Sequence, residues 1–156
     1  MSSIKYMVVN QKNCTSDMVQ SAVKMYCEMY NKEPWNGKWT GFTAFERIMR
    51  FLEAYYGLCI FALDEKNNAL GFVLGVVEQW WDGRYYCIKD FCVHPEHQGQ
   101  LIGSQIMLKL IESMREMHVK SMSVHTRCTA DSIRFYEKFG FHKMETMGFY
   151  NAAIVE

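Results

Sequence analysis

The run from Phe91 to Ser104, FCVHPEHQGQLIGS, carries the clearest chemical signal in this sequence. It reads as the end of a strand, a turn marked by Pro95, a loop containing Gly99 and Gly103, and the start of an amphipathic helix. Such a loop directs several backbone N–H groups toward one point, where the helix dipole adds partial positive charge. Glycine lets the backbone approach an anion because it has no side chain. The run therefore predicts a site for a phosphate or pyrophosphate. The alternative is a tight turn that only leads into a helix.

Two common phosphate-binding motifs are absent from the sequence. There is no G-x-x-x-x-G-K-[ST], which excludes a P-loop, and no G-x-G-x-x-G, which leaves a dinucleotide-binding fold unsupported. His94 and His97 are three residues apart, but no further cluster of ligands supports zinc, so we expect no metal site.

Composition limits the class of protein. The chain has 156 residues and 49% hydrophobic content, which suits a single domain over residues 1–156 with a substantial core. The 17 basic and 17 acidic residues give zero net charge, and no apolar run is long enough for a transmembrane helix. The first residues lack the apolar core of a signal peptide. We therefore expect no nucleic-acid or membrane partner. The six scattered cysteines, without a C-x-x-C, favour free thiols in the cytoplasm.

Hydrophobic periodicity predicts an α/β (α+β) fold with the element order βααβββαβαβ. The expected strands are Ile4–Val9, Leu58–Leu63, Ala69–Glu78, Tyr85–Val93, Lys120–Thr126 and a final strand region that begins in Phe141–Met147. The expected helices are Asp17–Asn31, a second one that begins with a capping box at Thr43–Glu46, one that follows the glycine-bearing loop, and Ala130–Lys138. The second helix has an apolar stripe of Phe45, Ile48, Met49, Leu52 and Tyr56. This order predicts a mixed, mostly antiparallel central sheet flanked by helices.

Two motifs resemble those of the GNAT superfamily of N-acetyltransferases. The family's acetyl-CoA loop has the pattern [RQ]-x-x-G-x-[GA] after a strand that ends near V-x-P. Val93, Pro95, Gln98 and Gly103 match it, and Leu101 stands where the family usually has glycine. Further along, the family often has N-x-x-A-x-x-x-Y-x-x-x-G-F. The matching residues there are Tyr136, Gly140 and Phe141, whereas Thr129 and Ser132 replace Asn and Ala. The element order is also that of the family.

The resemblance implies that acetyl-CoA is the co-substrate. In this family the strand before the loop splays from its parallel neighbour, here Lys120–Thr126, and offers backbone groups to pantetheine. An N–H near Cys92 or Val93 would polarise the thioester carbonyl. The cofactor-binding residues implied by the resemblance are Phe91, Cys92, Val93, Gln98, Gly99, Gln100, Leu101, Ile102, Gly103, Ser104, Thr129 and Ser132.

Tyr136 and Asp90 are the expected catalytic residues. The resemblance implies that Tyr136 gives its proton to the departing thiolate, as a phenol can; the alternative is a tyrosine of the core. Asp90 could hold the amine or a water that acts as base; the alternative is a solvated strand aspartate. His125 could also be the base, although a structural histidine fits it better. We interpret Cys92 as a packing residue, because the family transfers acetyl directly.

The expected acceptor site lies beside the loop Glu33–Thr40. Trp35 and Trp39 could stack on a sugar or face a cation, and Glu28 or Glu33 could attract one. Alternatively, both tryptophans anchor the loop on the core. The resemblance favours a small-molecule primary amine, aminoglycoside-like or other, ahead of a protein amino group. A non-catalytic acyl-CoA-binding sensor is a further alternative. Trp80 and Trp81 at a hairpin end are a candidate homodimer contact.

Overall fold

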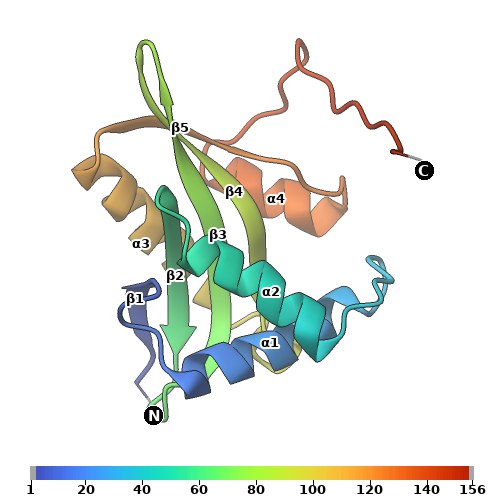
Figure 1. The fold of residues 1–156 in the computed structure, drawn as a ribbon. Coiled ribbons are helices and arrows are strands. Elements are labelled where there is room, and N and C mark those ends of the chain that lie inside the picture. Colours follow the sequence, from blue (N-terminus) through green and yellow to red (C-terminus); the bar gives the residue numbers. More distant parts are fainter. Residues whose placement is uncertain (1–2, 155–156) are drawn as a thin grey trace. The chain divides into compact units, whose positions relative to one another are not determined.

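The computed structural model describes residues 3–154, which form two compact units, one reaching to Val124 and one beginning at His125. The elements of the first unit are β1 (Lys5–Val9), α1 (Ser16–Tyr30), α2 (Gly41–Leu52), β2 (Gly57–Leu63), β3 (Ala69–Trp80), β4 (Gly83–Val93), the short 3-10 helix η1 (Pro95–His97), α3 (Ile102–Glu116) and β5 (Val119–Val124) (Figure 1). The second unit contains α4 (Ala130–Lys138).

The first unit is built on a sheet in the order β1-β2-β3-β4-β5. The first four strands pair antiparallel, and β5 pairs parallel with β4. A parallel pair needs a crossover connection, and α3 provides it. The mixed, mostly antiparallel sheet that the sequence predicts is thus confirmed.

Helices cover both faces of this sheet, because its strands bury alternate residues on opposite sides. Cys59, Phe61 and Leu63 of β2 belong to a core cluster with the apolar stripes of α1 and α2. The opposite face receives α3, whose Ile106 lies so near Gly71 that a Cβ there would be 3.0 Å from the isoleucine side chain. Figure 1 shows α1 and α2 crossing in front of the strands, with α3 behind them.

The start of α2 differs from the prediction. The N-cap is Thr40, and the capping box joins Thr40 to Thr43, three residues before the expected start. The buried residues of α2 are Ala44, Ile48 and Leu52, at a spacing of four. Phe45 lies one position off this stripe and is 43% exposed, and Tyr56 lies beyond the helix. The expected places of these two aromatic residues in the stripe were wrong.

The predicted last strand is absent from the described residues. Residues 141–147 contain neither helix nor strand, and α4 is the last regular element before residue 154. A strand is stable only beside a partner strand, and the described part of the second unit has none. Whether residues 1–156 act as a single domain stays a prediction. Among residues 3–154, no helix combines the length and apolar character needed to cross a membrane.

Candidate active site

The end of β4, residues 89–93, forms the centre of the candidate site. β4 pairs with β5 only as far as Ile88, opposite Val124, so its last residues run on beyond the parallel strand. On the β3 side, Asp90 lies opposite Leu74 but Ile88 lies opposite Gly75, which makes Lys89 the extra residue of a β-bulge. A strand that outruns its neighbour presents backbone polar groups to a ligand. This is the arrangement that the resemblance implies for Phe91–Val93.

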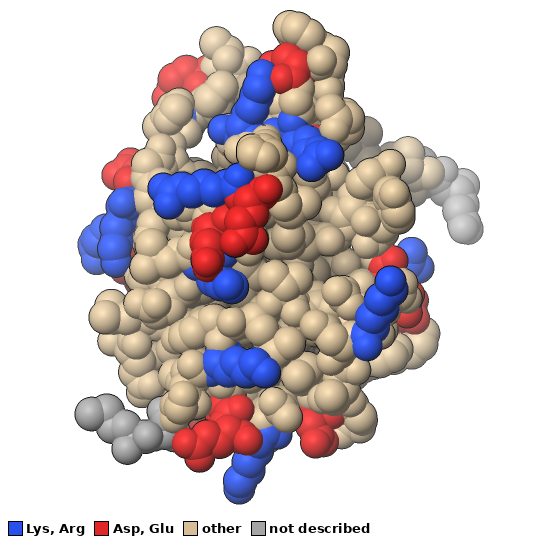
Figure 2. Space-filling model, turned by 90° about the vertical axis from the view of Figure 1, so that its left-hand side faces the viewer, with Lys and Arg blue, Asp and Glu red and all other residues tan. Residues whose placement is uncertain are grey.

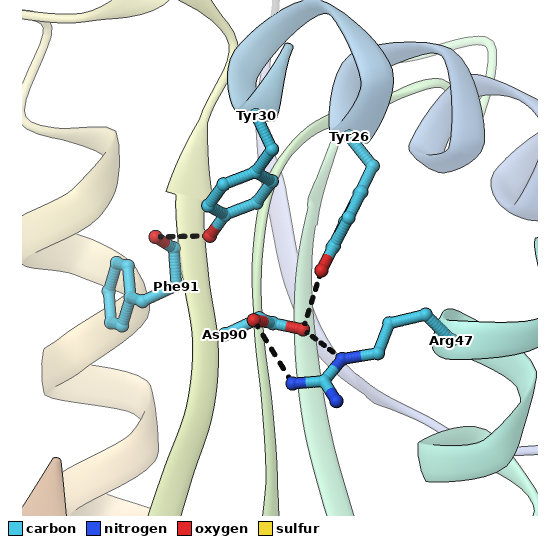
Figure 3. A network of polar contacts seen from close by, with 5 residues as sticks. All are labelled: Tyr26, Tyr30, Arg47, Asp90 and Phe91. Atoms are coloured by element: carbon cyan, nitrogen blue, oxygen red, sulfur yellow. Dashed lines mark hydrogen bonds and ion pairs between the residues drawn. The ribbon is translucent and has the colours of Figure 1, made fainter. Parts of the chain in front are cut away.

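Asp90 is held by two side chains from the helices that cover this face of the sheet (Figure 3). Arg47 of α2 donates from Nε to Oδ2 at 2.9 Å and from Nη2 to Oδ1 at 3.4 Å. The hydroxyl of Tyr26 on α1 donates to Oδ2 at 3.1 Å. The Asp90 side chain is only 11% exposed, so the alternative of a solvated strand aspartate was wrong.

Electrostatics keeps both donors of this network protonated. Burial, reinforced by the negative charge of Asp90, raises the pKa of Tyr26 above its usual value. Burial disfavours the charged form of Arg47, but the hydrogen bond and charge of Asp90 outweigh burial and raise the pKa of the guanidinium. The network is therefore a carboxylate with one cationic and one neutral donor.

Cys92 lies on the same face of β4 as Asp90, as expected. Its side chain is 4% exposed and belongs to the core cluster beneath α1 and α2. Burial, together with the charge of Asp90, raises its pKa well above the usual value. A protonated, buried thiol is a poor nucleophile, which agrees with a packing role.

The loop between β4 and α3 has the geometry of an anion-binding turn. Gly99 and Leu101 both have left-handed backbone, with φ of 83° and 63°. Left-handed residues that alternate with others turn successive N–H groups toward one concave side. Leu101 is the N-cap of α3, and its side chain makes no capping hydrogen bond. The first N–H groups of α3 therefore have no cap from the N-cap side chain and can bind an anion.

The left-handed backbone of Leu101 explains why glycine is common at this position in the family that the loop resembles. A side chain in the left-handed region costs roughly 1–2 kcal/mol, a cost that glycine does not have. Leu101 is 64% exposed, so no buried packing compensates for this conformation.

Side chains also contact the end of β4. Tyr30 of α1 donates to the carbonyl oxygen of Phe91 at 3.4 Å, and Gln98 donates to that of Val93 at 3.2 Å. Glu28 lies 3.1 Å from Nε2 of His94, whose Nδ1 accepts the N–H of Glu96. α1 is thus joined to the residues that lead into the loop between β4 and α3.

The expected acceptor loop packs on α1. Trp39 meets Tyr26 edge-on with ring centroids 4.8 Å apart, and Trp35 meets Tyr30 at 5.4 Å. Asn31 exchanges two hydrogen bonds with the backbone of Trp39. These contacts support the alternative in which both tryptophans anchor the loop. Glu33, by contrast, is exposed.

The second unit carries the other motif. Thr129 caps α4 in a capping box with Ser132, so the hydroxyls of both residues serve the helix start. Gly140 follows the end of α4 with φ of 88°, and the ring of Phe141 then packs against Tyr136 at 5.3 Å. The Tyr-x-x-x-Gly-Phe spacing therefore places the glycine just after the end of α4 and brings the rings of Tyr136 and Phe141 into contact. His125 is exposed, with its ring 5.7 Å from that of Phe149.

Three residues around the end of β4 were missed by sequence reasoning. None of Tyr26, Arg47 and Tyr30 was given a role in the site from the sequence. The sequence does place the basic Arg47 next to the apolar Ile48, but this pattern does not predict which residue Arg47 contacts. Within residues 3–154, no cluster of His, Cys, Asp and Glu side chains is arranged to bind a metal ion.

Comparison with known proteins assigns the chain to a family. The model of the acetyltransferase (GNAT) family matches residues 20–141, which include both motifs and the Asp90 network. The chain belongs to the GNAT family. A protein of Porphyra purpurea named "uncharacterized N-acetyltransferase ycf52" is 29% identical over 85 residues. That match covers 54% of this chain and 48% of the relative, so the chain spans about half the length of this GNAT relative.

Solved GNAT structures share the fold. A probable acetyltransferase superposes with a TM-score of 0.78 at 18% identity, covering 97% of this chain and 99% of the other. The aminoglycoside N-acetyltransferase AAC(6')-Iy, in complex with CoA, superposes with a TM-score of 0.74 at 13% identity, covering 99% and 97%. These likenesses confirm the predicted GNAT fold.

The GNAT co-substrate, acetyl-CoA, fits the residues of the candidate site. The left-handed residues and the start of α3 form a backbone concavity suited to pyrophosphate. A Cβ built on Gly99 would meet nothing within 4 Å, so the loop is open on that side. The end of β4 beyond Ile88 provides the backbone edge that pantetheine needs.

Proposed function

We propose that this chain is an acetyl-CoA-dependent N-acetyltransferase that acts on a primary amine of a small molecule, aminoglycoside-like or another amine. The observation that carries the proposal is the end of β4, which bulges at Lys89, runs past β5 and continues into the anion loop. Membership in the GNAT family supports the reaction, and the aminoglycoside N-acetyltransferase with the same fold supports a small-molecule acceptor.

The backbone would bind the co-substrate. Acetyl-CoA, when bound, supplies the activated acetyl thioester. The N–H groups of residues 99–104 would hold its pyrophosphate, and Phe91, Cys92 and Val93 would hold its pantetheine and polarise the carbonyl. Thr129 and Ser132 would border the same ligand, as the resemblance implies.

Side chains would help to remove a proton from the amine and would donate one to the thiolate. A C–N bond forms and a C–S bond breaks, while the amine loses one proton and the thiolate gains one. Asp90, oriented by Arg47 and Tyr26, would hold the amine or its base water beside the strand end. Tyr136 would donate the proton to the thiolate.

The acceptor would lie beside α1 and the loop that follows it, where Glu28, Glu33, Trp35 and Trp39 border the site. We further propose that the protein acts in the cytoplasm, because its six cysteines are free thiols. A homodimer would use Trp80 and Trp81, which are 55% and 93% exposed.

Both charge signs are interspersed over the face of the molecule in Figure 2. Such a face has no extended basic patch, which supports a partner other than nucleic acid or an anionic membrane.

A turnover screen with acetyl-CoA over a panel of amines, followed by thiol release, tests the proposal. We expect acetylation of at least one small amine. Acetyl-CoA at about 100 times its Kd should also stabilise the native state by roughly 2.7 kcal/mol, visible as a higher melting temperature. No melting shift with millimolar acetyl-CoA would contradict the assignment of the loop. A shift without turnover of any amine would favour an acyl-CoA-binding sensor.

A further inference from the structure

We infer that Arg47 is a specificity residue, and that the acceptor is an amine that also carries a carboxylate group. This inference rests on the proposed acetyl transfer and names its substrate class. Arg47 lies on α2 and binds Asp90, the residue immediately before the strand end that would hold the co-substrate. Figure 3 shows its guanidinium beside Asp90, where the proposed transfer would hold the amine.

The guanidinium has donors left for a ligand. A guanidinium has five N–H groups in a planar fork. Arg47 directs Nε and Nη2 to the two carboxylate oxygens of Asp90, and within residues 3–154 Nη1 makes neither a hydrogen bond nor an ion pair. The Arg47 side chain is 37% exposed, against 11% for Asp90, so a ligand can reach the arginine more easily than the aspartate. The Phe51 ring, 4.9 Å from the guanidinium carbon, holds the fork in place. Such a preorganised fork suits a carboxylate.

The charges nearby disfavour a polycation. The anionic charge of Asp90 is balanced by Arg47, and Tyr26 supplies a further donor to it. Glu28, expected to attract a cation, is engaged by His94 at 3.1 Å and lies 4.0 Å from Lys24. Of the acidic residues assigned to the acceptor site, only the exposed Glu33 forms no ion pair within residues 3–154. The Asp90–Arg47 pair is close to neutral, so an ammonium-rich acceptor would gain little from Asp90, whereas Nη1 of Arg47, which donates to neither oxygen of Asp90, can still donate to a carboxylate.

Matched acceptors test this inference. The probes are L-phenylalanine and L-methionine, each compared with its amide and with the amine that lacks the carboxyl group. For the wild-type protein, kcat/KM should be at least about tenfold higher for the carboxylate member of each series, as expected for a charge-assisted hydrogen bond. Differences in amine basicity cancel when kcat/KM of each variant is divided by kcat/KM of the wild type for the same acceptor.

The variants separate recognition from structure. Arg47→Gln combined with Asp90→Asn avoids an unpaired buried carboxylate, and it should lower kcat/KM for the carboxylate acceptors about 10- to 100-fold more than for their neutral partners. Arg50→Gln is the matched control, because Arg50 lies on the same helix, pairs with Glu46 and is 79% exposed. It should leave the preference unchanged.

A merely structural role for Arg47 would lower turnover of all acceptors by the same factor, and that result would overturn the inference. Turnover of amines without preference for a carboxylate would overturn it too, while leaving acetyl transfer intact. No turnover of any probe or other amine would overturn both proposals together.

Discussion

The anion loop and the Asp90 network both adjoin the end of β4, but they are built from different material. The loop from Gln98 to Ser104 is a backbone structure, defined by two left-handed residues and an uncapped helix start. The network consists of side chains from α1, α2 and β4, which are far apart along the chain. A backbone site should tolerate a change of residue as long as the backbone conformation survives. A side-chain network depends on each member.

The largest expected effect is a fall in kcat on substitution of Tyr136, which belongs to neither the loop nor the Asp90 network. This prediction tests whether the residue that protonates the thiolate lies outside both regions. Tyr136→Phe removes one oxygen and keeps the ring that packs on Phe141. If Tyr136 protonates the thiolate, kcat should fall about 10²- to 10⁴-fold. KM for acetyl-CoA should stay close to that of the wild type, because the interaction develops in the transition state. Steady-state kinetics and the melting temperature of the same variant separate the roles.

Tyr150→Phe is the matched control for this substitution, since Tyr150 lies in the same unit and is 93% exposed. A lower melting temperature with near-wild-type kcat for Tyr136→Phe would identify a packing residue.

The network should be the more fragile region toward removal of a side chain. Arg47→Met leaves the poorly exposed Asp90 carboxylate without its cation, and the free energy of unfolding should fall by about 3 kcal/mol. The double variant with Asp90→Leu should recover most of that loss, because an apolar pair replaces the ion pair. Urea denaturation of the singles and the double gives the coupling energy. Arg50→Met, at an exposed ion pair, should change stability by less than about 0.5 kcal/mol. Equal losses for Arg47→Met and Arg50→Met would show that the network is only a surface feature.

The loop should respond to backbone conformation and little to side-chain identity. Gly99→Ala adds a Cβ that meets nothing within 4 Å, so its cost is the left-handed backbone, about 1 kcal/mol. Leu101→Gly should relieve about as much strain, offset by up to about 1 kcal/mol of unfolded-chain entropy. Acetyl-CoA affinity of Leu101→Gly should be unchanged or tighter, as measured by calorimetry. A large loss of affinity would mean that the loop depends on the leucine side chain.

An effect as small as those in the loop is expected for the hydroxyl of the network. Tyr26→Phe removes one hydrogen bond to Asp90 and should lower stability at neutral pH by about 1 kcal/mol. The pKa of a tyrosine in the unfolded chain is about 10. In the native state, burial and the charge of Asp90 raise the pKa of Tyr26 above that value. Above that pH the unfolded state binds fewer protons, so the free energy of unfolding falls as pH rises. Tyr26→Phe should show a shallower fall than the wild type.

The exposed Tyr55→Phe should keep the wild-type slope. Identical alkaline profiles for the wild type and Tyr26→Phe would contradict the assigned environment of Tyr26.

The sequence predicted well what depends on local chemistry. Alternating and helical apolar patterns located the strands and helices of the first unit, because burial of one face imposes those periods. The loop could be predicted because Pro95 fixes its own φ and Gly99 permits the left-handed conformation that the loop needs. The start of α2 was misplaced because Thr43 is a good capping residue in either register, and only the contact with Thr40 distinguishes the two. The expected strand at 141–147 needed a partner, which no local pattern can provide.

From its sequence alone, this protein can be assigned to the GNAT family, with a mixed sheet and a glycine-bearing loop after the fourth strand. The reason is that strands, helices and this loop depend on residues that are consecutive in the sequence. Only the tertiary structure decided that Asp90 is held by Tyr26 and Arg47, that Cys92 is sealed in the core, and that Leu101 takes a left-handed conformation. The contacts of Asp90 and Cys92 join distant segments, and the bulge at Lys89 shifts the register of the strand. Neither feature produces a periodic pattern in the sequence.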